Sequence, residues 1–188
     1  MAHALVIGGT GMLADTSLWL VNDGYHVSVI GRSAHRMEDL RNRTTKPALL
    51  TPILVDYCNI ALLKEKLEET LKHNGPIELV VAWIHSYADT TLENISNVIS
   101  IENNGEWKLF HVLGSKANLS EVQEKLKLPA RSQYRQIQLG FMMEEGHARW
   151  LTHEEISQGV VAAIQQDQPI HIVGTLQPWE KRPLLTFV

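Results

Sequence analysis

The residues whose types and spacing indicate chemistry lie near the start of the chain. An apolar run, Ala4 to Ile7, leads into Gly8-Gly9-Thr10-Gly11-Met12-Leu13, and Ala14 follows. Gly8 lets the chain turn sharply after a strand, and Gly11 has no side chain to keep a diphosphate away from the backbone. Free amides at the start of a helix here would face the phosphates. We therefore expect residues 8–13 to bind a dinucleotide diphosphate; the alternative is a tight turn without a ligand.

A second polar cluster follows the next apolar run and indicates which dinucleotide is bound. Arg32 and Ser33 come directly after Gly31, Arg36 is close behind, and no carboxylate lies between Gly31 and Glu38. NAD sites place an Asp or Glu at this point to accept hydrogen bonds from the ribose, and that carboxylate would repel a 2′-phosphate. A guanidinium pairs with a phosphate instead. These residues therefore favour NADP(H), the alternative being solvated side chains at a helix start.

Alternating strands and helices are needed to position these residues. Runs rich in Val, Ile and Leu predict strands over 3–7, 26–31, 51–56, 77–84, 106–115, 134–141 and 169–174. Apolar spacing and capping residues predict helices, caps included, over 12–22, 33–43, 59–73, 90–101, 118–128 and 152–166. Right-handed crossovers then give an α/β fold, a doubly wound parallel sheet of the Rossmann type in three layers. The expected strand order, 3-2-1-4-5-6-7, reverses beside the glycines.

Composition limits the classes of function. The 188 residues include 44% hydrophobic and 20% charged residues, which predicts a single globular NAD(P)-binding domain over 1–188. The net charge of −4 argues against a nucleic-acid partner, which needs a basic face. One cysteine, Cys58, argues against disulfides and cysteine-bound zinc, and we expect no metal. Apolar runs stay well below the roughly 20 residues of a membrane span, and no signal peptide is evident, so we expect a cytoplasmic protein without membrane contact.

Five segments together resemble the short-chain dehydrogenase/reductase superfamily over most of the chain. They are GGTGMLA at 8–14, GRS at 31–33, Asp56 after the third strand, VVAWIHS at 80–86 and FHVLGS at 110–115. The resemblance implies that Asp56, with Tyr57 beside it, touches the adenine. It also implies that the family's Asn-Asn-Ala-Gly segment next to the cofactor falls on Ala82-Trp83-Ile84-His85, where Trp83 or His85 would crowd the cofactor unless turned away.

The proton donor of this family is not found in the sequence. Hydride transfer to a carbonyl needs a donor for the developing oxyanion, and the family supplies a Tyr whose pKa is lowered by a Lys four residues later. All four tyrosines lack that Lys: Val29, Ala61, Thr91 and Gln138 stand in its place. The segment between Ser115 and the sixth strand is also short for the family's long catalytic helix.

Other residues offer substitutes for that donor. Ser115 falls where the family has its catalytic serine, Lys116 follows it, and His85 and His111 are expected at or near the ends of strands four and five. A histidine with a near-neutral pKa can act as an acid. Each of these residues also has a structural alternative, as a turn, cap or packed side chain. The same holds for His147, Arg149 and Trp150, which either line a substrate lip or pack.

Two functions remain compatible with the sequence. One is an NADP(H)-dependent oxidoreductase that acts on a small carbonyl or alcohol substrate with a reduced active site. The other is a redox sensor or regulator that binds NADP(H) without turnover, similar to the NmrA-like regulators, which also begin strand–GGTG–helix and lack the Tyr-Lys pair. A scaffold without ligand is a third reading, which the glycines and Arg32 disfavour. The oligomeric state stays open, with a homo-oligomer among the expectations.

Overall fold

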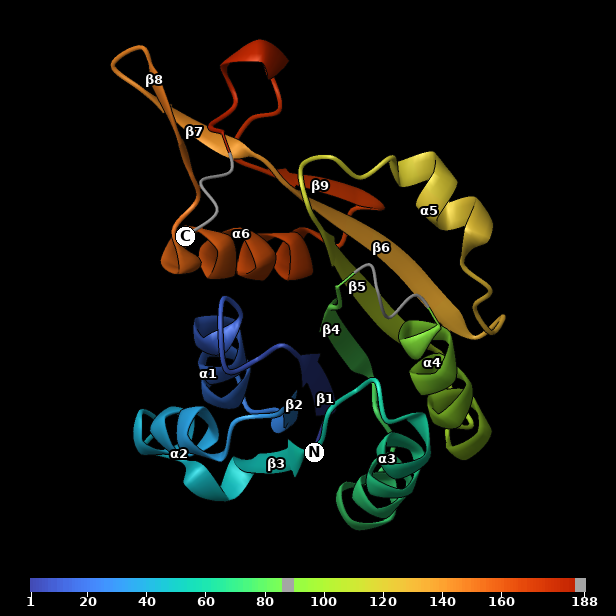
Figure 1. The fold of residues 1–188 in the computed structure, drawn as a ribbon. Coiled ribbons are helices and arrows are strands. Elements are labelled where there is room, and N and C mark those ends of the chain that lie inside the picture. The colour runs from blue at the N-terminus through green and yellow to red at the C-terminus, as the bar shows by residue number, and fades with distance from the viewer. Residues whose placement is uncertain (86–89, 185–188) are drawn as a thin grey trace.

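A parallel sheet organises the molecule, which is shown as a ribbon in Figure 1. The computed structural model describes residues 1–85 and 90–184. The main sheet within these ranges has the order β3-β2-β1-β4-β5-β6-β9, and each neighbouring pair is parallel. The strands are β1 His3–Ile7, β2 His26–Gly31, β3 Leu50–Leu54, β4 Leu79–Trp83, β5 Trp107–Leu113, β6 Ser132–Leu139 and β9 Ile170–Val173. The predicted order is confirmed, with β9 as the seventh strand.

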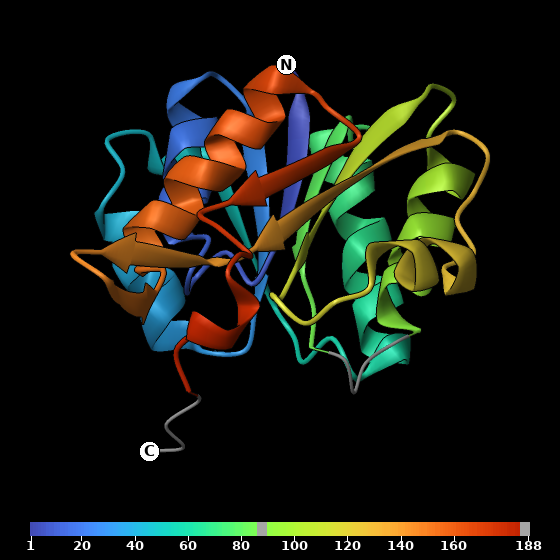
Figure 2. The same ribbon diagram turned by 90° about the horizontal axis from the view of Figure 1, so that it is seen from above.

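Helices cover both faces of this sheet. One face carries α1 Ala14–Asn22, α2 Ala34–Asn42 and α6 His153–Gln166, and the other carries α3 Ile60–Asn74, α4 Thr91–Glu102 and α5 Leu119–Lys125. Figure 2 shows the two helix layers on either side of the strands. The predicted three-layer, doubly wound α/β fold of the Rossmann type is therefore confirmed. No helix in 1–85 or 90–184 is long and apolar enough to cross a bilayer.

Two hydrophobic cores lie on the two sides of the sheet. Val6 and Phe110 belong to the core under α1 and α6, while Leu5 and Trp107 belong to the core under α3 and α4. All four side chains are 0–1% exposed. Neighbouring residues of β1 face opposite cores because side chains alternate along a strand, and burial on both faces is typical of parallel sheets.

Three helices begin at caps that the sequence predicts, Ser33, Asn59 and Thr152, and Asn118 is a further cap that the structure adds. The side chains of Ser33, Asn59 and Asn118 accept hydrogen bonds from the first turns of α2, α3 and α5, and Thr152 forms a reciprocal capping box with Glu155. The helix predicted from residue 12 instead begins at Ala14, after turns over residues 8–13. Leu13, at the N-cap position of α1, has no side-chain oxygen to cap the helix, so this helix follows main-chain turns alone.

An antiparallel hairpin between β6 and α6 was not predicted. Its strands are β7 Phe141–Glu144 and β8 His147–Trp150, and Figure 1 shows it projecting from the sheet. Glu145 and Gly146 make the turn with φ of 47° and 82°, the left-handed conformation that tight hairpins need. Arg149 binds the carboxylates of Glu144 and Glu155, which ties the hairpin to the start of α6. Arg149 therefore has ion-pair partners on both the hairpin and α6.

Candidate functional site

The glycine-containing loop lies at the carboxyl end of β1, where the strand order reverses between β1 and β4. Gly8 has φ +82° and makes the sharp turn that the sequence predicts. A Cβ on Gly11 would meet only the carbonyl oxygen of Gly8, at 3.9 Å. The backbone at Gly11 is thus open to a close approach, as expected.

Main-chain donors in this loop are left without acceptors. Gly11 and Ala14 donate to the carbonyls of Gly8 and Gly11, at 3.2 and 3.0 Å. The amides of Gly9, Thr10, Met12 and Leu13 have no hydrogen-bond acceptor within the described ranges. Four free donors ahead of a helix start can bind an anion, because amide dipoles and the helix dipole act in the same direction. This geometry suits a diphosphate.

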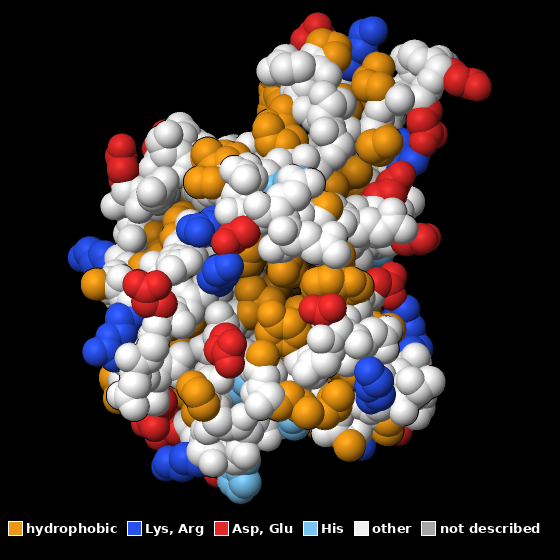
Figure 3. Space-filling model, turned by 180° about the vertical axis from the view of Figure 1, so that it is seen from behind, with side chains coloured by type: hydrophobic (Ala, Val, Ile, Leu, Met, Phe, Trp, Pro, Cys, Tyr) orange, Lys and Arg blue, Asp and Glu red, His pale blue; other side chains and the backbone are white. Residues whose placement is uncertain are grey.

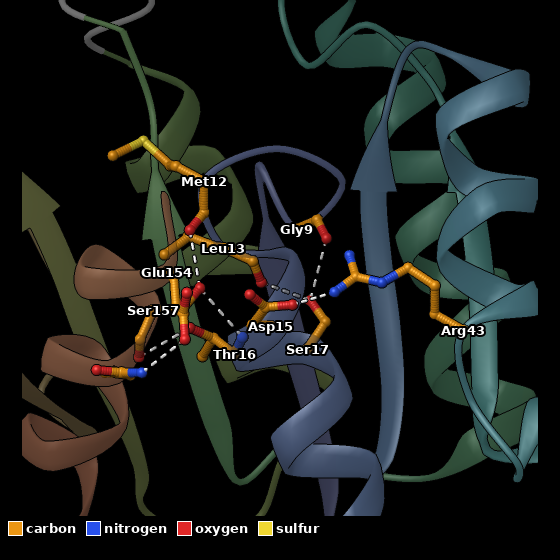
Figure 4. A network of polar contacts seen from close by, with 10 residues as sticks. Gly9, Met12, Leu13, Asp15, Thr16, Ser17, Arg43, Glu154 and Ser157 are labelled. Carbon is orange, nitrogen blue, oxygen red and sulfur yellow. Dashed lines mark hydrogen bonds and ion pairs between the residues drawn. The ribbon is translucent and has the colours of Figure 1, made fainter. Parts of the chain in front are cut away.

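Side chains from two helices fix the loop, as Figure 4 shows. The Ser17 hydroxyl contacts the carbonyls of Gly9 and Leu13 at 3.3 and 3.1 Å. Ser157 of α6 donates to the Met12 carbonyl at 2.8 Å and also pairs with the backbone and side chain of Thr16. Sequence reasoning missed these three hydroxyls. Ser17 lies one helical turn after Leu13, which is a usable signal, whereas nothing in the sequence links residue 12 to residue 157.

Arg32 and Asp56 meet at the ends of β2 and β3. A guanidinium nitrogen of Arg32 lies 3.5 Å from a carboxylate oxygen of Asp56, and their side chains are 66% and 46% exposed. The Cys58 amide donates to Asp56 at 3.0 Å, and this bond, with the charge of Arg32, holds the pKa of Asp56 below its usual value. The residues predicted to contact the 2′-phosphate and the adenine are therefore neighbours.

Ser33 and Arg36 lie beside Arg32 at the start of α2. The Ser33 hydroxyl accepts a hydrogen bond from the Arg36 amide at 3.3 Å, which is the capping contact. Its own proton remains available for a phosphate oxygen. The Arg36 residue is exposed. All three candidate 2′-phosphate residues thus lie at one edge of the sheet, next to the glycine loop.

Trp83 lies against the first glycine of the loop. A Cβ on Gly8 would be 3.5 Å from Trp83 Cδ1, so the indole is not turned away from this edge. The His85 ring packs against it edge-on at a centroid distance of 5.9 Å. The His85 amide lies 3.5 Å from the Tyr57 hydroxyl, which brings a third predicted residue to the cluster. Ala82 is 0% exposed inside β4.

Ser115 and Lys116 occupy the turn after β5. Gln138 of β6 fixes this turn by donating to the carbonyls of Ser115 and Ala117, at 3.3 and 2.8 Å. The Ser115 hydroxyl and the Lys116 ammonium make no hydrogen bond or ion pair with the rest of the described chain. Because β4 and β5 are parallel neighbours, this turn and His85 share one edge of the sheet.

His111 does not lie at this edge, contrary to expectation. It pairs with Ala82 and Gln136 in the middle of β5, and its ring nitrogen Nδ1 is 2.9 Å from the Tyr134 hydroxyl. Burial lowers the pKa of His111 to about 4 and raises that of Tyr134 to about 12. Both side chains are therefore neutral at pH 7, and the pair belongs to the packing between the sheet and α5.

A metal centre is not evident in the described ranges, where no group of three or more His, Cys, Asp or Glu side chains is placed to bind an ion. The predicted cofactor residues, by contrast, gather at the carboxyl edges of β1 to β4, and the candidate catalytic residues at the edges of β4 and β5. This site can bind an extended anionic nucleotide across the strand reversal.

Several solved structures that superpose on this chain are dehydrogenases or reductases. An apo SCOR enzyme from Clostridium thermocellum superposes with a TM-score of 0.71 at 15% identity, covering 99% of this chain and 96% of its own. A short-chain dehydrogenase/reductase from Serratia marcescens gives 0.68 at 17% identity, covering 86% and 89%. A variant of the actinorhodin polyketide ketoreductase with NADPH gives 0.67 at 10% identity, covering 93% and 96%.

Comparison of the sequence with known proteins finds no relative. No protein-family model matches the chain, and no curated protein matches it. At 10–17% identity the structural likeness shows the fold: the chain folds as short-chain dehydrogenases and reductases do.

Proposed function

We propose that this protein is an NADP(H)-binding member of the short-chain dehydrogenase/reductase superfamily, with residues 1–188 acting as one cytoplasmic domain. The four unpaired amides of the glycine loop carry this proposal, because an anion bound at the strand reversal would supply the hydrogen-bond acceptors that they lack. Arg32 supports the choice of the phosphorylated ribose, and the ketoreductase of the same fold was solved with NADPH.

The reaction that we propose is hydride transfer between the nicotinamide and a small carbonyl or alcohol substrate. The bound cofactor would supply or accept the hydride. Within this chain, residues 8–13 would hold the diphosphate, and Trp83 would form one wall of the nicotinamide side. Ser115 would donate a hydrogen bond to the substrate oxygen, with Lys116 or His85 as the source of the proton.

A second function, an NADP(H) sensor without turnover, is favoured by one observation. Within residues 1–85 and 90–184, the tyrosine hydroxyl placed at this edge is that of Tyr57, 3.5 Å from the His85 amide, and Ala61 stands where a lysine would be needed. A sensor needs the cofactor contacts alone. Both functions use the same dinucleotide site, so a measurement of substrate turnover is what distinguishes them.

Arg32→Ala tests the cofactor assignment. Arg41→Ala, on the helix α2 that follows Arg32, is the matched control. Calorimetric titration of NADPH and NADH into each protein gives the dissociation constants. We expect Arg32→Ala to weaken NADPH roughly tenfold to a hundredfold, as for a lost hydrogen bond to a charged group, with little change for NADH. Equal losses for both nucleotides, or no binding by the wild type, would refute NADP(H).

Turnover separates the two proposed functions. Consumption of NADPH is followed by absorbance with a panel of small aldehydes and ketones, for the wild type and for Ser115→Ala. Turnover that Ser115→Ala abolishes, with NADPH affinity unchanged, supports the oxidoreductase. Tight NADPH binding with no turnover on any member of the panel supports the sensor.

A further inference from the structure

A cleft lies at the amino-terminal edge of the sheet, opposite the edge that carries the glycine loop. It has a volume of about 380 Å³. Leu79, Trp107 and Phe110, at or near the starts of β4 and β5, line the cleft but are only 4%, 1% and 0% exposed, so the accessible apolar surface comes from the half-buried Tyr25 of the α1–β2 turn and Ile164 of α6. Figure 3 shows this side of the molecule, where hydrophobic side chains gather in the middle and charged ones surround them.

Some polar side chains of the cleft already have hydrogen-bond or ion-pair partners within the protein, and others do not. Lys108 is paired with Asp167 at 2.6 Å, and Glu106 accepts a hydrogen bond from Gln133 at 2.6 Å. The carboxylate of Glu78 has no ion pair or hydrogen bond with the described part of the chain, and neither has the hydroxyl of Tyr25. An available carboxylate and an available phenol therefore lie beside an apolar surface.

We propose that this cleft binds a small organic cation, an ammonium group carried on an apolar or aromatic body. The ammonium would pair with Glu78 and donate to the Tyr25 hydroxyl, while the body would lie against Ile164. The Tyr25 ring adds an attraction for a cation at its face.

The charges around the cleft select this class of ligand. An anion would face Glu78 and Glu106, and the one lysine of the lining is already paired with Asp167. A neutral ligand would gain the apolar contacts but no partner for Glu78. The pKa of Tyr25 is raised by burial and then by the charges of Asp23 and Glu78, so the field of Glu78 reaches the phenol.

This site is separate from the proposed dinucleotide site. The cleft is lined from the beginnings of β4 and β5, whereas the glycine loop follows the end of β1. Failure of one assignment therefore leaves the other standing, and each can be measured in the presence of the other's ligand.

Three probes of similar shape test the proposal: phenethylamine, the neutral phenethyl alcohol and the anionic 3-phenylpropanoate. Amide chemical-shift titrations of the whole protein give each dissociation constant. We expect phenethylamine to bind best and to shift amides of β4, β5 and the α1–β2 turn. Glu78→Gln, at an exposed position, should weaken the amine roughly tenfold and leave the alcohol unchanged. Glu102→Gln on α4 is the matched control.

A second variant separates a lost charge from a lost cavity. Ile164→Phe fills the cleft from α6 and should weaken all three probes. The proposal is overturned if phenethylamine causes no shifts at about 1 mM, a concentration at which even weak ligands bind. It is also overturned if the alcohol binds as well as the amine, or if both Glu78→Gln and Ile164→Phe leave amine binding unchanged. NADPH affinity should be the same in both variants.

Discussion

Two glycines of one loop serve different physical needs. A Cβ on Gly9 would lie 2.6 Å from the Ser17 hydroxyl and 2.9 Å from methyl carbons of Val6 and Val29. Gly9 is therefore required by the packing of α1 against the sheet, while Gly11 faces open space. The same motif thus combines a requirement of the fold with a requirement of the proposed ligand, and substitution can separate them.

Gly9→Ala and Gly11→Ala form a matched pair at the residue scale. We expect Gly9→Ala to lower the free energy of unfolding by about 1–3 kcal/mol, because Ser17 and two valines must move. Gly11→Ala should leave stability within about 0.5 kcal/mol and weaken NADPH at least tenfold, since its methyl lies where the diphosphate approaches. Urea denaturation and calorimetric titration measure the two effects. Normal NADPH binding by Gly11→Ala would argue against a diphosphate at this backbone.

The sequence predicted local structure correctly where the signal is local. The sharp turn at Gly8 and the caps of α2, α3 and α6 each depend on residues within a few positions of the feature that they specify. The Ser157 contact with Met12 joins residues 145 positions apart, and no local pattern encodes it. His111 was misplaced for a related reason: strand ends are uncertain by a residue or more, and burial is set by the neighbouring strand and α5.

At the scale of elements, the alternation of strands and helices was sufficient to predict the sheet order, because parallel crossovers have one hand. The hairpin was missed because its strands have only four residues each, too short for a clear periodic pattern. The segment 119–125 does form a helix, yet none of its residues is buried. Hydrogen bonds from Gln136 and Gln138 to carbonyls near its start replace the apolar contact that a helical pattern would reveal.

Gly159 lies inside α6, where neither a cap nor a turn requires a glycine, and it allows this helix to pack closely against β9. A Cβ on Gly159 would lie 2.4 and 2.5 Å from the two methyl carbons of Val173, which is 7% exposed. Alanine favours a helix interior by about 1 kcal/mol over glycine, but overpacking costs about 1–3 kcal/mol. The clash should therefore exceed the gain in helix propensity.

A double-mutant cycle tests this contact. We expect Gly159→Ala alone to lower the free energy of unfolding by about 1–2 kcal/mol. In a Val173→Ala background, which lacks both methyl groups, the same change should be neutral or stabilising. The coupling energy from urea denaturation of the four proteins should then exceed about 1 kcal/mol. Equal effects of Gly159→Ala in both backgrounds would show that Val173 does not limit the approach of α6.

Across the whole molecule, buried imidazoles connect stability to pH. Burial lowers the pKa of His3, His26, His111 and His171 below the usual value. His3 is 0% exposed, and its ring contacts the Gly75 carbonyl and the Ser28 hydroxyl, both at 2.8 Å. At His111, the Tyr134 hydroxyl accepts from Gln136 at 3.4 Å, so it is free to donate to Nδ1 of a neutral ring. These side chains fill structural positions that require the uncharged form.

The sign of the pH effect follows from these lowered values. An unfolded histidine takes up a proton near pH 6.5, whereas His111 in the folded chain does so only near pH 4. The unfolded state therefore binds more protons between these values, and stability is complete above pH 6.5 and is lost as the pH falls towards 4. The contribution of His111 to this loss is about 3 kcal/mol. The lowered pKa of Asp167 adds to the loss only at still lower pH, because that carboxylate titrates below its ordinary value of 3.8.

His111→Gln isolates this contribution, because an amide can accept the Tyr134 hydrogen bond and does not titrate. Urea denaturation at pH 7.5, 6.5, 5.5 and 4.5 should give a free energy of unfolding that falls with pH in the wild type and falls less steeply in the variant. The comparison is between pH values within each protein, so any cost of the substitution at pH 7.5 cancels. His153→Gln, at an exposed position, should keep the wild-type slope. Parallel curves for the wild type and His111→Gln would mean that the imidazole inside β5 is as easily protonated in the fold as in the unfolded chain, and that its place under α5 admits a charge.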